Sequence, residues 1–157
     1  MSFGAINNCT MKTINALLIV FSLALASNAQ SVKENDVPTA VRNAFAAKYP
    51  QSKAEKWVKE ENNYEAELTL KGKGYEAAFN ANGKWIETER EIKSSALPQA
   101  VKDGLAKSKY GTWTIKEAVE IESPEHKVVY ELELASGKEK VALYFTPDGK
   151  IVKEEKD

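Results

Sequence analysis

The feature that most restricts the fold of this chain is an internal repeat. Three segments of the first half return in the same order in the second half, one at an offset of 60 residues and two at 66. Because the order is kept and the offset grows by only six, we interpret the chain as two copies of one structural unit. We expect the six extra residues to form a longer turn near residues 123–126. The repeated segments are VPTAV (37–41) and LPQAV (97–101), YEAEL (64–68) and YELEL (130–134), and AFNANGKWI (78–86) and YFTPDGKIV (144–152).

Each copy begins with a segment of helical periodicity. In the first copy, apolar residues from Val37 to Tyr49 recur at the spacing that places them on one face of a helix. Asp36 is a candidate cap for this helix, and Pro38 fits its first turn, where a missing N–H is tolerated. The same apolar stripe returns in the second copy at Leu97, Val101 and Leu105.

Strands are expected after each helix. Residues 64–71 alternate between apolar and polar side chains, which is typical of a half-buried antiparallel strand. Asn82-Gly83 and Asp148-Gly149 are strong hairpin signals, and a two-residue turn there needs positive φ at both central residues. We expect four strands in each copy, at 53–60, 63–71, 74–80 and 84–91, and at 112–121, 127–135, 140–146 and 150–156.

These elements predict an α+β fold made of two tandem helix-plus-four-strand units, at residues 37–91 and 97–156. The strands would form one antiparallel meander with both helices packed on one face. The other face is rich in Glu, Lys and Thr and should meet solvent or a partner. The linker, residues 92–96, contains no Gly or Pro, so we expect the two sheets to join into one platform.

Residues 1–29 have the pattern of a secretory signal peptide. Lys12 precedes an apolar run at residues 14–25, and small residues end the segment at Ala29. The run is shorter than the ~20 residues that span a bilayer as a helix. We therefore predict cleavage after Ala29, no stable membrane anchor, and a periplasmic or secreted mature chain. Met11 is a candidate start, and Cys9, the single cysteine, precedes the apolar run.

Composition and motifs argue against several function classes. A net charge of -1 without a basic cluster argues against binding nucleic acid. The chain has no Gly-rich phosphate loop and no nucleophile elbow, and its single histidine, His126, falls in a polar turn. We therefore predict no enzyme activity and no cofactor, and a hydrolase is the least favoured hypothesis.

Alternating glutamates are the most prominent polar pattern. Glu87, Glu89 and Glu91 would share one face of a strand, as would Glu65 and Glu67. Lysines and an arginine are interleaved with these glutamates, so we interpret the pattern as cross-strand charge pairing and predict no metal site. A small-ligand or divalent-cation-binding protein is the alternative function.

Three aromatic residues are candidate contacts for a protein partner. If Ala54 and Val58 point inward, Trp57 points outward, and Tyr144 is out of phase with the core positions beside it. Trp85 is the third candidate, because either it or its neighbour must face outward. Exposed Trp and Tyr side chains are typical anchors of protein interfaces.

The repeated motifs resemble those of the PepSY-like, beta-lactamase-inhibitor-like family. They are (Val/Leu)-Pro-x-Ala-Val, Tyr-Glu-x-Glu-Leu and Phe-x-x-x-Gly-Lys, and the resemblance covers residues 37–156. It implies helices on one side of a curved antiparallel sheet whose open face binds another protein, and it supplies no catalytic residues. The leading expectation is therefore an exported, non-enzymatic inhibitor or modulator of an envelope or secreted protein. A homodimer formed by pairing of edge strands is a second expected kind of partnership.

Overall fold

The computed structural model describes residues 29–156, so the predicted signal peptide, residues 1–29, lies outside the described residues except for Ala29. Each unit consists of one α-helix followed by four strands, as the repeat predicts. A short strand precedes the first unit, and a 3-10 turn precedes each helix, at Glu34–Asp36 and Ser94–Ala96. The elements are β1 (Gln30–Val32), α1 (Thr39–Lys48), β2 (Lys56–Glu60), β3 (Asn63–Leu70), β4 (Lys73–Asn80), β5 (Trp85–Glu91), α2 (Gln99–Lys107), β6 (Thr114–Glu122), β7 (Val129–Ser136), β8 (Glu139–Phe145) and β9 (Ile151–Lys156).

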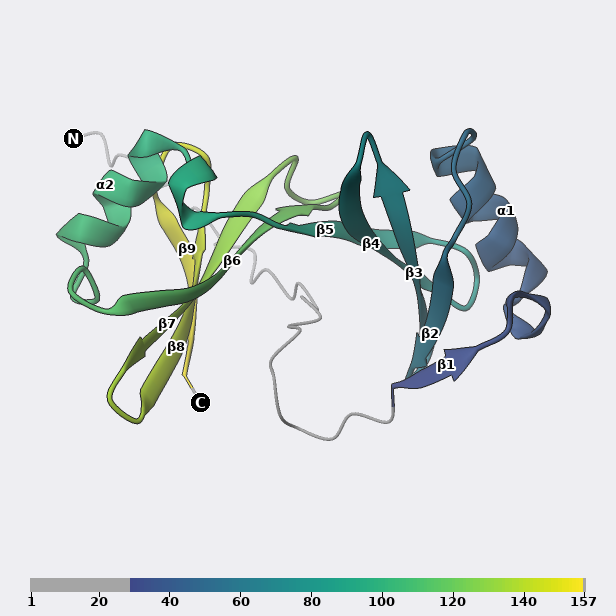
Figure 1. Ribbon diagram of the computed structural model, residues 1–157, viewed down its shortest axis with the longest axis horizontal. Coiled ribbons are helices and arrows are strands. Elements are labelled where there is room, and N and C mark those ends of the chain that lie inside the picture. The colour runs from purple at the N-terminus through teal and green to yellow at the C-terminus, as the bar shows by residue number, and fades with distance from the viewer. Residues whose placement is uncertain (1–28, 157) are drawn as a thin grey trace, which may run out of the picture.

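All nine strands form one antiparallel sheet in sequence order, from β1 at one edge to β9 at the other. The last strand of the first unit, β5, pairs with the first strand of the second unit, β6, from Thr88 opposite Glu122 to Glu91 opposite Val119. The expected single platform is therefore confirmed. Figure 1 shows that this platform is strongly curved, with β5 running between the two halves.

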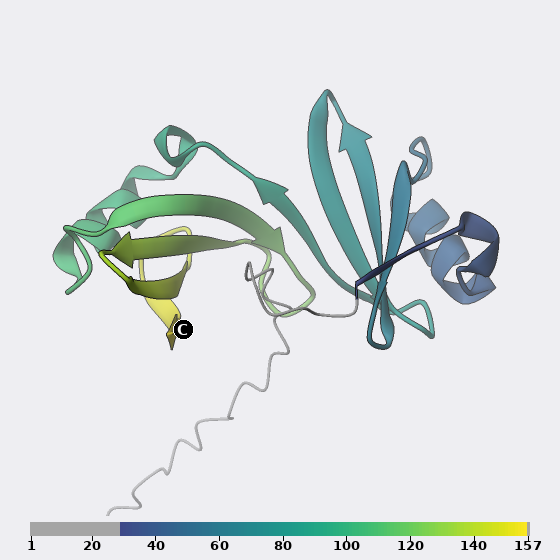
Figure 2. The same ribbon diagram turned by 60° about the horizontal axis from the view of Figure 1, so that its bottom comes forward.

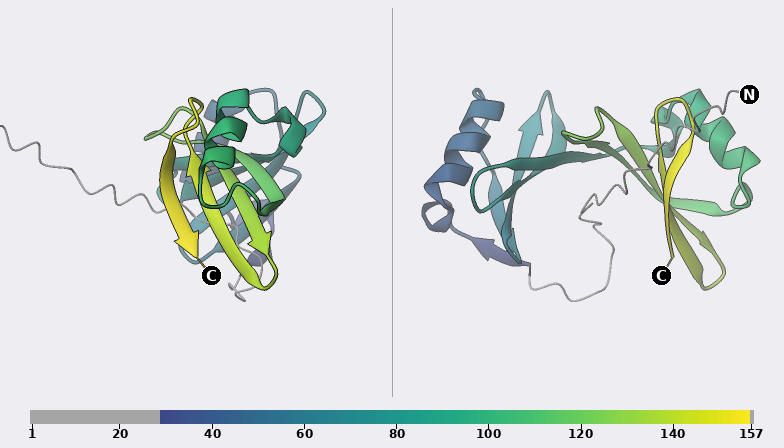
Figure 3. Two further views of the ribbon diagram at one scale, coloured as in Figure 1. Left: turned by 90° about the vertical axis from the view of Figure 1, so that its left-hand side faces the viewer. Right: turned by 180° about the vertical axis from the view of Figure 1, so that it is seen from behind.

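The two helices lie on the same face of the sheet, at opposite ends of the molecule. Figure 2 and the right-hand view of Figure 3 show α1 outside the first unit and α2 outside the second, with the other face left uncovered. Beneath α1, Val41 and Phe45 pack in one cluster with Leu68 and Phe79. Beneath α2, Val101 and Leu105 belong to an equivalent cluster. The core is thus divided into one cluster under each helix and a third, smaller cluster of Ile121, Val129 and Tyr144.

The hairpin turns at the end of each unit pack directly against that unit's helix. Gly83 has φ +80°, and a Cβ built on it would lie 2.4 Å from the carbonyl oxygen of Ala40 in α1. Gly149 has φ +83°, and its Cβ would lie 2.0 Å from the carbonyl oxygen of Ala100 in α2. Glycine is therefore required twice over at both positions, by its backbone conformation and by the close approach of the helix.

Two local predictions are wrong. Neither Asn82 nor Asp148 adopts positive φ. Gly83 and Gly149 do, and their N–H groups donate to the carbonyls of Asn80 and Thr146, so each loop is longer than a two-residue turn. Asp36 does not cap α1, because it lies in the preceding 3-10 turn and Pro38 occupies the N-cap position. The expected longer turn between β6 and β7 is present, closed by hydrogen bonds between Ser123 and His126.

Candidate functional site

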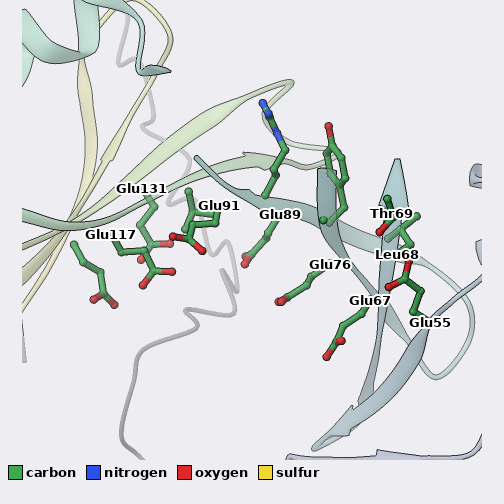
Figure 4. A pocket seen from close by; sticks show the side chains of 14 residues that line it. Glu55, Glu67, Leu68, Thr69, Glu76, Glu89, Glu91, Glu117 and Glu131 are labelled. Atoms are coloured by element: carbon green, nitrogen blue, oxygen red, sulfur yellow. The ribbon is translucent and has the colours of Figure 1, made fainter. Parts of the chain in front are cut away.

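The uncovered face of the sheet carries a groove lined by glutamates from both units. We call this the acidic groove; it encloses about 400 Å³. In Figure 4 the labelled glutamates from both halves project to the same side of the sheet. The acidic residues that line the groove are Glu55, Glu67, Glu76, Glu89, Glu91, Glu117, Glu131 and Glu133.

The strand register places like charges directly opposite each other. Glu76 on β4 is opposite Glu67 on β3 and opposite Glu89 on β5. Across the second unit, Glu117 on β6 is opposite Glu133 on β7. Like-charged cross-strand neighbours destabilise a sheet by roughly 0.2–1 kcal/mol per pair. The arrangement therefore costs folding stability, which is typical of residues kept for a function.

The predicted cross-strand charge pairing occurs at Lys56–Glu67 and at Arg90–Glu120, and of the two glutamates only Glu67 lines the groove. Lys56 on β2 lies 2.5 Å from Glu67. Arg90, the one basic residue that lines the groove, instead bonds Glu120, which does not line it, at 2.6 Å. None of the ion pairs formed among residues 29–156 includes Glu76, Glu89 or any of the other lining glutamates apart from Glu67.

Burial changes the acidity of the carboxyl groups on this face. It raises the pKa of Glu89 to about 9, and the charges of Glu87 and Glu131 raise it further. Burial and the neighbouring carboxylate of Glu76 raise the pKa of Glu65 to about 8. Burial likewise raises the pKa of Glu131 to about 7, although a hydrogen bond from Tyr144 opposes the shift. Several of these groups therefore hold protons at neutral pH.

Two of the three aromatic candidates are buried. Trp57 is only 4% exposed and packs beneath α1 against Phe45, so its predicted outward orientation is wrong. The error comes from a bulge between Ile115 and Glu117, which reverses the alternation on the equivalent strand of the second unit.

Tyr144 does lie on the uncovered face, out of phase with the core as predicted, but it is fully buried there. Trp85 is half-buried on the helix-covered side, where its Nε1 donates to Thr88 and the Lys48 ammonium lies 3.3 Å from its ring. The prediction that these residues contact a partner through exposed rings is therefore wrong for Trp57 and Tyr144.

Among the described residues, neither a metal centre nor a membrane-spanning helix is found. Within residues 29–156 there is no group of three or more His, Cys, Asp or Glu side chains arranged to hold a metal ion. His126, the single histidine, lies on the β6–β7 loop and does not line the groove. No helix in the part of the chain that the structure describes is long and apolar enough to cross a membrane.

The acidic groove was not predicted, although the chain contains a signal for it. Lys71 and Gly72 both have positive φ, as a two-residue hairpin turn requires. A turn centred on these two residues fixes the register so that Glu67 meets Glu76. Reading the register from this turn would have predicted like charges, rather than pairs of opposite charge, on the uncovered face.

With this geometry in hand, comparison with known proteins identifies the family. The family described as "Putative beta-lactamase-inhibitor-like, PepSY-like" matches the chain at residues 24–73 and 62–153. These matches cover well over half of the sequence, so the chain belongs to this family. No match was found among curated protein sequences.

Solved structures share the fold. A "BLIP-like protein" from Bacteroides fragilis is 31% identical, with a TM-score of 0.68 over 76% of this chain and 86% of that one. A DUF2874 family protein from Bacteroides ovatus is 22% identical, with a TM-score of 0.69 over 76% and 86%. A structure described as "putative periplasmic proteins", from Bacteroides eggerthii, is 19% identical, with a TM-score of 0.67 over 76% and 88%.

Proposed function

We propose that this member of the PepSY-like, beta-lactamase-inhibitor-like family is an exported, non-enzymatic binding module. Its acidic groove would bind a positively charged surface of a protein partner in the periplasm or outside the cell. The periplasmic placement is supported by the predicted signal peptide and by the description of the related structure from Bacteroides eggerthii.

The observation that carries the proposal is the concentration of carboxylates on the one face that no helix covers. The groove contains eight lining glutamates and a single lining arginine, which is already paired with Glu120. Opposite charge across an interface steers encounter and fixes orientation, so a basic protein surface complements this face. The BLIP-like name of the Bacteroides fragilis relative agrees with a binding role for the fold, but does not define the partner.

A cationic peptide tests this charge preference directly. We would titrate acetylated, amidated octalysine into the chain from Gln30 onward, which contains every described helix and strand, and measure binding by calorimetry. Octaglutamate serves as the probe of opposite charge. We expect octalysine to bind at about 20 mM salt and to bind about tenfold more weakly at about 150 mM, because screening shortens the reach of the groove's field.

A matched pair of variants distinguishes binding in the groove from attraction by the net charge of the protein. Glu76→Gln/Glu117→Gln/Glu133→Gln removes three carboxylates from the groove, whereas Glu34→Gln/Glu61→Gln/Glu125→Gln removes three exposed carboxylates outside it. Only the first variant should weaken octalysine binding. Equal loss in both would show that overall charge alone attracts the peptide. A melting-temperature increase with Ca²⁺ alone, and none with octalysine, would favour the cation-binding alternative instead.

A further inference from the structure

A second cavity lies at the end of the second unit that is away from its junction with β5. It encloses about 700 Å³ and shares no lining residue with the acidic groove. We call it the basic cavity, because the charged residues that line it are one glutamate, Glu139, and four lysines. The lysines are Lys109, Lys138, Lys140 and Lys156.

The strand register brings these residues together from four parts of the chain. Trp113, which also lines the cavity, directly precedes β6 in the connection from α2. Ser136 is opposite Glu139 across the tip of the β7–β8 hairpin, and Val141 on β8 is opposite Lys156 on β9. Figure 1 shows this hairpin tip beside the C-terminal end of β9. The cavity is therefore framed by the segment after α2, the hairpin tip and the end of the last strand.

The lysines of the cavity are only partly neutralised. The Lys109 ammonium lies 3.1 Å from a carboxylate oxygen of Glu154, and the Lys156 ammonium lies 3.7 Å from the same oxygen. One carboxylate thus serves two lysines. Neither Lys138 nor Lys140 forms an ion pair within residues 29–156. Positive charge is therefore left over at this cavity, although the net charge of the whole chain is -1.

Two aromatic rings form an apolar wall of the cavity. The rings of Tyr110 and Trp113 pack edge-on, with centroids 4.9 Å apart and planes at 81°. Tyr110 belongs to the core beneath α2, and its hydroxyl donates to Glu154 at 2.6 Å, so this ring is held from both ends. Trp113 is only half-buried. Its indole therefore offers a flat apolar surface on which a ring can stack.

The repeated fold does not by itself require this arrangement. At the offset of 66 residues, Lys138 and Lys140 correspond to Gly72 and Gly74 in the first unit's hairpin. The strands next to the two hairpins also differ, because β5 is paired with β6 on its other side, whereas β9 is the edge of the sheet. The lysines and the open edge are thus particular to the second unit.

We propose that the basic cavity binds a small molecule that carries two or more negatively charged oxygen groups on a ring. The lysine ammonium groups would bind the charged oxygens, and the Trp113 indole would stack on the ring. A cavity of this size falls within the roughly 300–1,000 Å³ that is typical of small-molecule sites. The inference does not depend on the proposed function, which concerns the acidic groove.

Benzene-1,3,5-tricarboxylate tests this assignment, and citrate is the matched probe with three carboxylates but no ring. Each would be titrated by calorimetry into the chain from Gln30 onward at about 20 mM salt, where charge screening is weak. The indole N–H signals of the three tryptophans would be followed by NMR, with Trp113→Phe to assign the signal of Trp113. We expect the aromatic probe to bind about fivefold more tightly than citrate and to shift the Trp113 signal selectively.

Two double variants test the role of the lysines. Lys138→Gln/Lys140→Gln removes two ammonium groups from the cavity without breaking an ion pair of the described residues. Lys71→Gln/Lys73→Gln removes two exposed lysines from the equivalent hairpin of the first unit. With folding checked by circular dichroism, we expect the first variant to bind benzene-1,3,5-tricarboxylate about tenfold more weakly and the second less than about twofold.

Three results would overturn the proposal. The first is equal weakening by the two double variants, which would assign binding to overall charge. The second is citrate binding as tight as that of the aromatic probe, or an unchanged Trp113 signal. The third is absence of binding of the aromatic probe to the unaltered chain at up to about 10 mM. Octalysine binding is measured separately, so failure here is distinct from failure of the proposed function.

Discussion

The indole ring of Trp57 packs edge-on against the phenyl ring of Phe45, with ring centroids 5.4 Å apart and planes at 67°. This contact joins the first strand after α1 to the centre of that helix, and Phe79 approaches the same phenyl ring at 6.4 Å. The first unit's core is therefore organised around Phe45, with aromatic rings from two strands against it.

Substituting Trp57 tests this placement. Trp57→Ala should lower the free energy of unfolding by about 3–5 kcal/mol, because it leaves a large cavity beneath α1. Urea denaturation followed by far-UV circular dichroism measures the loss. Trp85→Ala is the matched control: Trp85 is half-buried, so its truncation should cost clearly less. A Trp57→Ala variant as stable as the parent would mean that the ring is not in the core.

Alanine substitutions at two turn glycines test how closely the last hairpin turn packs on α2. Gly149→Ala introduces a Cβ 2.0 Å from the carbonyl oxygen of Ala100, whereas a Cβ at Gly137 has nothing within 4 Å. Both glycines have positive φ, at +83° and +62°, so conformational strain is common to the two substitutions. Gly137→Ala should cost about 1 kcal/mol and Gly149→Ala at least twice that, because α2 must also move. Equal melting temperatures for the two variants would contradict the close packing of this turn on α2.

Stability should fall as pH rises. Glu65, Glu89 and Glu131 titrate in the folded chain at about 8, 9 and 7, against 4.5 as the ordinary value for Glu. Between pH 4.5 and about 9, the folded state binds more protons than the unfolded state, so raising the pH favours unfolding. The lowered pKa of Glu154 acts only below this window.

We expect the melting temperature to be about 5 °C or more lower at pH ~8.5 than at pH ~5.5, at constant ionic strength. Scanning calorimetry would measure the change. Glu65→Gln/Glu89→Gln should flatten the profile, since two of the titrating groups are removed. A melting temperature that rises over this range would contradict the desolvation of these carboxyl groups.

The hydrogen bonds from the Tyr144 hydroxyl can be tested by removing that hydroxyl. Tyr144→Phe keeps the ring but removes the hydrogen bonds to Glu131 and Glu155. The hydrogen bond lowers the pKa of Glu131, so its loss should raise that pKa further above about 7. Titration of the Glu131 carboxyl carbon by NMR would detect the shift, and we expect about 1–2 kcal/mol of lost stability at alkaline pH. An unchanged Glu131 titration would show that the bond does not form in solution.

Much of the architecture could be predicted because the repeat and the strand alternation are local signals. The stripe from Val37 to Phe45 identified the first helix and its buried face, and the linker at 92–96 allowed β5 and β6 to be placed in one sheet. The phase of Trp57 could not be obtained in this way, because a bulge near Ile115 in the other unit changes the alternation used for comparison. Single-residue insertions of this kind leave no clear mark on hydrophobic periodicity.

The acidic groove was harder to predict for a different reason. It depends on which residues face each other across strands and on the curvature that brings β3 and β7 toward one another. Alternation predicts only the side of the sheet on which Glu89 lies, whereas its neighbours Glu76 and Glu131 follow from register and curvature. Interleaved lysines therefore suggested paired charges where the folded chain places carboxylates together.

The pairing of β5 with β6 also shows how one sheet edge of the molecule could meet an edge of another copy. It joins the last strand of one unit to the first strand of the next. If β9 of one molecule paired with β2 of another, the same junction would be repeated head to tail between molecules. Contacts of this kind do not close on themselves and can grow into open-ended fibres. The three residues of β1 occupy the outer edge of β2, with Gln30 opposite Lys59 and Val32 opposite Trp57. This short strand therefore covers part of the edge of β2, so a head-to-tail contact of that kind would have to displace it.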